Sequence, residues 1–97
     1  MSINVIYIPV DGNIYIKSDK NEDLFNNIGD FITLSKNNKL DTISLYQNDT
    51  HLYELIVNDC KENQSINKYA SKLKNEEIVG NVVLIKQSED GLESIDN

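Results

Sequence analysis

The sequence predicts a single small α+β domain, with a mixed or mostly antiparallel sheet of five to six strands, two short helices on one side, and the order ββαβββαβ. Apolar, β-branched runs bounded by turn residues recur along the chain and predict the strands. Two other segments carry apolar residues at helical spacing. The 97 residues leave room for one core. We therefore expect one domain over residues 1–86 and a flexible acidic tail over residues 87–97.

The first two strands are predicted as a hairpin. Residues 3–10 are almost wholly apolar, Asp11-Gly12 is typical of a tight turn, and residues 13–17 form the returning strand. With a loop of only these two residues, one face carries Val5, Tyr7, Ile14 and Ile16, and the other carries Ile6, Ile8 and Tyr15. Both faces are thus apolar, so the second face either meets a protein partner, or packs on the chain's own helices or a second copy. We predict Ile6, Ile8 and Tyr15 as a candidate protein interface.

A short helix is predicted over residues 20–28. Asp19 and Glu22 have the spacing of a capping box, and Gly29 is a natural residue just beyond a helix end. The next strands are expected at residues 31–35, 40–46 and 51–57.

The second helix is predicted over residues 66–74. Its apolar stripe consists of Ile66, Tyr69, Ala70 and Leu73. Either Ser65 or Asn67 can cap its start. The last strand follows at residues 78–86, where Gly80 marks a bulge or a close backbone approach. The expected core includes Leu24, Ile28, Tyr69, Ala70, Leu73, Val82 and Leu84.

Composition excludes several functional classes. The formal net charge is −7 and every basic residue is lysine, so direct nucleic-acid binding is not expected. The excess of acidic residues leaves three alternatives open: it keeps the protein soluble, it attracts a basic partner, or it mimics nucleic acid. The single cysteine fits a reducing compartment, and neither a signal peptide nor a membrane-length apolar run is present in the sequence. We predict a cytoplasmic protein, in the host cell if it is viral.

No catalytic, cofactor-binding or metal-binding residues are predicted. His51 is the only histidine and Cys60 the only cysteine, and neither has companions at the spacing of a zinc site. Asp11-Gly12 and Asn48-Asp49 resemble fragments of calcium loops, but the remaining ligands do not follow. The alternative of an enzyme requires the fold to bring His51 to Cys60.

Several blocks together resemble a domain family of unknown function that is widespread in bacteriophages and bacterial mobile elements. The blocks are Leu24-Phe25-Asn26-Asn27-Ile28-Gly29 followed by Phe31-Ile32, then Leu55-Ile56-Val57-Asn58-Asp59, and Asn67-Lys68-Tyr69-Ala70-Ser71-Lys72-Leu73 followed by Ile78-Val79-Gly80-Asn81-Val82-Val83-Leu84. The chain departs from the family in a longer middle region, residues 35–51, and in Gln64 and Ser65, where proline and glycine are often seen. The resemblance implies a fold and a phage-like setting, and carries over no catalytic residue.

These observations together predict a non-enzymatic protein-interaction module. We expect a phage or mobile-element accessory protein that binds and modulates or inhibits a host protein such as a defence nuclease. The partner is a protein, basic if the acidic charge attracts it, and a homo-oligomer is open. Two alternatives remain: an oligomer that sequesters a small ligand or nucleotide, and an enzyme that uses His51 and Cys60.

Overall fold

One antiparallel sheet forms the centre of the protein. The computed structural model describes residues 2–33 and 39–95, in which the elements are β1 (Ser2–Ile8), β2 (Tyr15–Lys20), α1 (Asn21–Ile32), β3 (Leu40–Gln47), β4 (Leu52–Asn58), α2 (Lys68–Lys74), β5 (Val82–Ser88) and β6 (Gly91–Glu93). The strand order is β2-β1-β5-β4-β3, and β6 pairs with β5. The predicted class, one small α+β domain with a mostly antiparallel six-stranded sheet and two helices, is confirmed.

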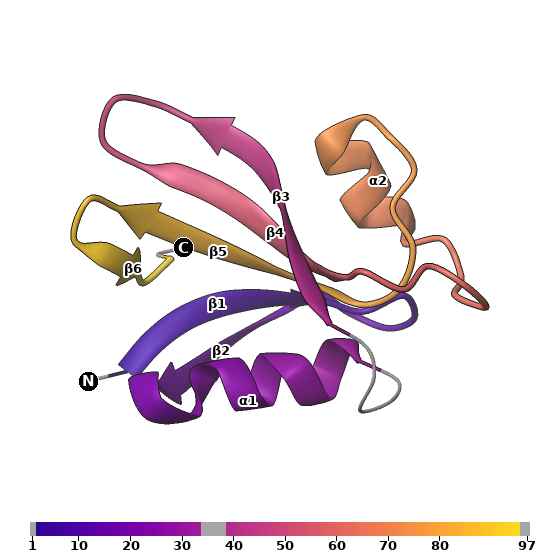
Figure 1. Cartoon of the computed structure of the whole chain (residues 1–97), viewed down its shortest axis with the longest axis horizontal. Helices are drawn as coiled ribbons and strands as arrows, with labels where there is room; N and C mark the ends of the chain where they lie inside the picture. Colours follow the sequence, from indigo (N-terminus) through magenta and orange to yellow (C-terminus); the bar gives the residue numbers. More distant parts are fainter. Residues whose placement is uncertain (1, 34–38, 96–97) are drawn as a thin grey trace.

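The two helices cover opposite faces of this sheet rather than one, as Figure 1 shows. Helix α1 buries Leu24, Ile28 and Ile32 against one face, together with Ile3, Val5, Tyr7, Ile56, Val83 and Ile85. Helix α2 buries only Ala70 against the other face, together with Ile8, Leu55, Val57, Ile78 and Val82. Because side chains alternate along a strand, β1 and β5 contribute to both cores.

The first hairpin pairs one residue out of the predicted register. Tyr7 lies opposite Tyr15, and Ile6 lies opposite Ile16. Pro9 has no amide hydrogen to pair, so β1 ends at Ile8 and the loop is longer than two residues. A shift of one residue turns every side chain of the second strand to the other face. Tyr15 therefore shares the α1 face with Tyr7, and the predicted face assignment of β2 is wrong.

Helix α1 is longer than predicted and its predicted cap is wrong. It continues through Gly29 to Ile32, so Phe31 and Ile32 belong to the helix and do not open the strand expected at residues 31–35. Residues 34–35 of that expected strand lie outside the described residues. The buried Asp19 makes no cap and instead accepts hydrogen bonds from the Tyr7 hydroxyl at 3.1 Å and the Asn27 amide at 3.0 Å. Burial, and then the bond and charge of Asp19, raise the pKa of Tyr7.

Asn67 caps α2 and fastens it to the sheet. Its Oδ1 accepts from the Ala70 amide at 3.0 Å, while its Nδ2 donates to the carbonyls of Ile8 and Gly80, each at 2.9 Å. Gly80 has a φ of +80°, and a Cβ at this position would collide with the Gln64 side chain, which confirms the predicted close approach. One buried amide thus sets the position of α2 relative to β1 and to the segment before β5.

The C-terminal segment is docked on the sheet, so the predicted tail over residues 87–97 is wrong for residues 87–95. Strand β5 extends to Ser88, and β6 pairs with it through a turn that ends at Gly91. The Ile95 amide donates to the Asn4 carbonyl at 3.0 Å and its side chain is buried. Apolar residues at 92 and 95 supply this docking, and they are few enough for the surrounding acidic composition to hide them. Residues 96–97 lie outside the described chain.

Replacing the Asn67 side chain tests its role in the fold. We expect Asn67→Ala to lower the free energy of unfolding by about 2–4 kcal/mol, because a cap is lost and two buried carbonyls lose their donor. Asn67→Asp is the matched control, since it keeps the cap acceptor but sets a carboxylate against the two carbonyls, and it should be at least as unstable. Urea denaturation measures both variants, and wild-type stability in either contradicts the assignment.

Shortening the chain tests the docked C-terminus. A chain ended after Gln87 loses β6 and Ile95, and we expect it to be less stable by about 2–5 kcal/mol, the usual cost of deleting a large buried aliphatic side chain. A chain ended after Ile95 should match the full-length protein. Equal thermal unfolding midpoints for both shortened chains would show that the segment contributes nothing.

Candidate functional site

The three predicted interface residues do not form one surface. Ile8 is fully buried beneath α2, and Ile6 is half-buried on the same face. Tyr15 lies on the opposite face, where its ring stacks on that of Tyr7 with centroids 5.2 Å apart and meets Phe31 edge-on. The register change in the first hairpin is the cause, because it moves Tyr15 away from the isoleucines.

The exposed apolar surface instead lies on and beside α2. Ile66, Tyr69 and Leu73 are 51%, 49% and 39% exposed, and we call them the α2 apolar surface. Tyr69 and Leu73 were predicted to be core residues, and that prediction is wrong. Among the other expected core residues, Leu24, Ile28, Ala70 and Val82 are buried and Leu84 is half-buried.

Helix geometry explains why the stripe is exposed. Successive residues are separated by about 100° around a helix, so Tyr69 and Leu73 lie about 100° and about 60° to the same side of Ala70. The Asn67 hydrogen bonds hold the helix so that Ala70 faces the sheet. One edge of the stripe is therefore buried and the remainder turns outward.

The sheet continues this apolar character beyond α2. On the α2 side, one cross-strand row runs through all five main strands and consists of Ile16, Ile6, Leu84, Leu55 and Ile43. Leu55 is fully buried, and exposure increases toward Ile16 at the β2 edge. Short as it is, α2 leaves the β2 end of this row partly uncovered.

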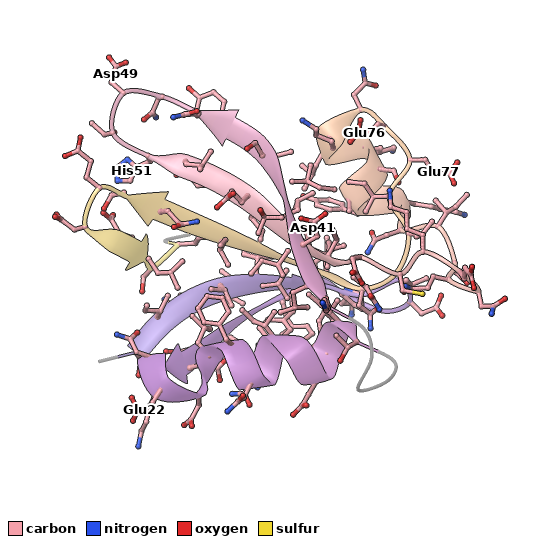
Figure 2. All side chains as sticks on the ribbon, in the orientation of Figure 1. Glu22, Asp41, Asp49, His51, Glu76 and Glu77 are labelled. Atoms are coloured by element: carbon pink, nitrogen blue, oxygen red, sulfur yellow. The ribbon has the colours of Figure 1, made fainter. Side chains whose placement is uncertain are left out.

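Charge is arranged unevenly around these surfaces. The exposed side chains of Lys68 and Lys72 flank the α2 apolar surface, and α2 itself contains no acidic residue. Figure 2 shows Glu22, Asp49 and Glu77 at widely separated places on the molecule. The acidic charge is thus dispersed, which fits solubility better than a single anionic face that mimics nucleic acid.

A polar cluster joins the β3–β4 turn to β6. Asn48 Oδ1 accepts hydrogen bonds from the Thr50 hydroxyl and the His51 amide, and the Thr50 oxygen lies 2.8 Å from His51 Nδ1. His51 Nε2 lies 3.1 Å from Glu93 Oε1. A hydrogen bond from Ser88 lowers the pKa of the Glu93 carboxyl, burial opposes this effect, and the bond and charge of His51 add to it.

The contacts in this cluster give His51 a structural role. The Thr50 oxygen lies 2.8 Å from His51 Nδ1 and Glu93 Oε1 lies 3.1 Å from Nε2, so both ring nitrogens have polar partners within the protein. These contacts fix the ring between the β3–β4 turn and β6. Sequence analysis found no partner for His51, because Glu93 lies 42 residues away along the chain.

His51 and Cys60 are not brought together. His51 precedes β4 (Leu52–Asn58) and Cys60 follows it, so the strand separates them by about 20 Å or more at 3.3 Å per residue. Cys60 is half-buried, and its amide donates to Asn58. The arrangement on which the enzyme alternative depended is therefore not present.

Comparison with protein-family models, with curated proteins and with solved structures found no match to this chain. The resemblance to a phage-borne domain family therefore stays a prediction. Within residues 2–33 and 39–95, no three histidine, cysteine, aspartate or glutamate side chains converge on a point that could hold a metal ion. Neither α1 nor α2, the helices of the described chain, has the length and apolar character needed to cross a bilayer.

The Glu93 contacts predict a pH dependence of stability. A carboxyl whose pKa is lowered by folding stabilises the protein above its unfolded pKa, and this contribution is lost as the pH falls through the lower folded value. Glu93→Gln should therefore be less stable than wild type at neutral pH, and the difference should vanish in acid. Urea titrations of both proteins across pH 2.5–7 measure it, with Glu89→Gln as the control, and a difference that is constant with pH contradicts the assignment.

Proposed function

We propose that this protein is a non-enzymatic protein-binding module whose α2 apolar surface contacts the partner. The observation that supports this best is the exposure of Ile66, Tyr69 and Leu73 together on one short, anchored segment. Single exposed apolar residues are ordinary on protein surfaces. Three large ones gathered beside a partly covered sheet face form the kind of patch that marks an interface.

The anchoring of α2 supports binding as well as folding. Asn67 fastens the start of the helix, and the Lys74 ammonium donates to the Ser44 carbonyl at 2.8 Å near its end. A surface held at both ends loses little conformational freedom when it docks. Tyr69 combines a large apolar ring with a polar hydroxyl, as residues that dominate interfaces commonly do.

The setting we propose is that of a phage or mobile-element accessory protein that modulates or inhibits a host protein such as a defence nuclease. Its support is the sequence resemblance and the net charge of −7. The alternative of an enzyme has lost its main support, because His51 and Cys60 lie at opposite ends of β4.

Charge substitution on α2 tests the binding surface. We expect Tyr69→Glu and Leu73→Glu each to abolish capture of the partner when the tagged protein is purified from its native cells, because a carboxylate cannot be desolvated in an apolar contact. Their melting temperatures should stay close to that of wild type, since both side chains are exposed. Mass spectrometry identifies the captured protein.

The matched control is Phe25→Glu, which charges an aromatic residue of similar exposure on the outer face of α1. It should retain the partner. Capture that survives both α2 substitutions, or that Phe25→Glu abolishes equally, excludes the α2 apolar surface as the binding site.

A further inference from the structure

The two outer strands of the sheet differ in how their edges are protected. In the pair β3–β4 the Lys39 carbonyl accepts from the Asp59 amide, so the backbone groups of Lys39 point toward β4. Because this direction alternates along a strand, the backbone groups of Thr42 and Ser44 point away from β4, toward the open edge. Asp41 Oδ1 accepts the Thr42 amide hydrogen at 2.8 Å, and Lys74 donates to the Ser44 carbonyl. A bulge also interrupts β3 between Ser44 and Tyr46. Side chains and a bulge thus block this edge against another strand.

The β2 edge is open by the same reasoning. The Asn4 carbonyl accepts from the Ile95 amide and the Asn4 amide donates to the Ser94 hydroxyl, both on the side of β1 away from β2. By alternation the backbone amide and carbonyl of Val5 point toward β2, where Val5 pairs with Lys17. The amide and carbonyl groups of Ile16 and Ser18 must then point away from the sheet. In the described part of the chain no strand lies on that side of β2.

The side chains at the β2 edge favour a strand, rather than a flat surface, as the binding partner. Ile14, Tyr15 and Ile16 are consecutive and are 39%, 44% and 37% exposed. Ile16 lies on the α2 side of the sheet, and Tyr15 lies on the α1 side. A partner docked on either face would leave the other side chain in water, whereas a strand added beside β2 flanks both.

We propose that the β2 edge pairs with the β2 edge of a second copy of this chain, antiparallel about a two-fold axis at Ile16. Ile16 then faces Ile16 of the second copy in a hydrogen-bonded pair, Tyr15 faces its Lys17, and Ile14 faces its Ser18. Lys20 lies opposite Gly12 of the second copy, next to Asp11. The central pair is apolar and no like charges lie opposite each other, and this self-complementarity selects a second copy over a foreign strand.

A register with its axis at Lys17 is less favourable. An axis at Lys17 sets the two lysines directly opposite each other, where like charges destabilise a sheet. Asp19, the one carboxylate on β2, lies 3.6 Å from Lys17 Nζ of its own chain, but it is buried and also bonded to Tyr7 and Asn27, so it offsets only part of this repulsion. With the axis at Ile16 the aliphatic row on the α2 side continues from one copy into the next.

The net charge of −7 on each copy opposes this contact at long range. Salt screens repulsion between dispersed surface charges, and it leaves backbone hydrogen bonds and apolar contacts largely intact. Dimerisation should therefore strengthen as salt is raised. An interface that depended on opposite charges would weaken instead.

Cross-linking tests the register. In a Cys60→Ser background, Ile16→Cys places two thiols in a hydrogen-bonded pair with Cα atoms about 5.5 Å apart, within disulfide range. We expect oxidised glutathione to convert most of this variant to a covalent dimer. Thr42→Cys in the same background, at the blocked β3 edge, is the control and should stay monomeric.

Sedimentation velocity of the full-length chain tests the dimer without a cysteine. Ser18→Pro removes an amide hydrogen that points outward, so the fold should survive, as circular dichroism can verify, while the dimer dissociation constant should rise at least about tenfold. The proposal is overturned if wild type sediments as a monomer at all concentrations and salt levels. It is equally overturned if Thr42→Cys cross-links as fast as Ile16→Cys, or if folded Ser18→Pro dimerises like wild type.

Discussion

Strand β5 joins the two halves of this protein, and the remaining structure depends on it. The β1–β2 and β3–β4 hairpins do not pair with each other, because β5 lies between them and pairs with β1 on one side and β4 on the other. Val82 and Val83 are both fully buried, one on each face of the sheet. Because β5 comes late in the chain, both cores close only through contacts between distant segments, the kind of topology that folds slowly.

What could be predicted from the sequence was local. Apolar β-branched runs located five of the six strands, and helical spacing located both helices. The register of the first hairpin could not be predicted from its turn residues, because Pro9 ends β1 while Asn81, far along the chain, accepts the Val10 amide hydrogen. The role of Asp19 was also mispredicted, as a helix cap, because its actual donors, on Tyr7 and Asn27, meet it only in the folded state.

The candidate sites show the same limit. Spacing reveals the stripe that contains Tyr69 and Leu73, but only the Asn67 hydrogen bonds determine that Ala70 faces the sheet and the others do not. The contact between His51 and Glu93 joins the β3–β4 turn to β6, two segments that sequence analysis treats separately. Near the C-terminus, acidic composition outweighed the few apolar residues that dock it, although glycine at 91 and apolar residues at 92 and 95 were a usable signal.

The distribution of charge connects the two interaction surfaces. Over most of this chain, dispersed carboxylates raise the cost of close approach by another acidic protein. The outer side of α2 carries Lys68 and Lys72, and the β2 edge carries Lys17 and Lys20, while the only carboxylate on either element is the buried Asp19. These are also the two elements where large apolar side chains lie exposed. Carboxylates still lie close by, with Glu76 and Glu77 just beyond α2 and Glu22 and Asp23 just beyond β2. The lysines on the two elements therefore lower the charge opposition to association at these surfaces without removing it.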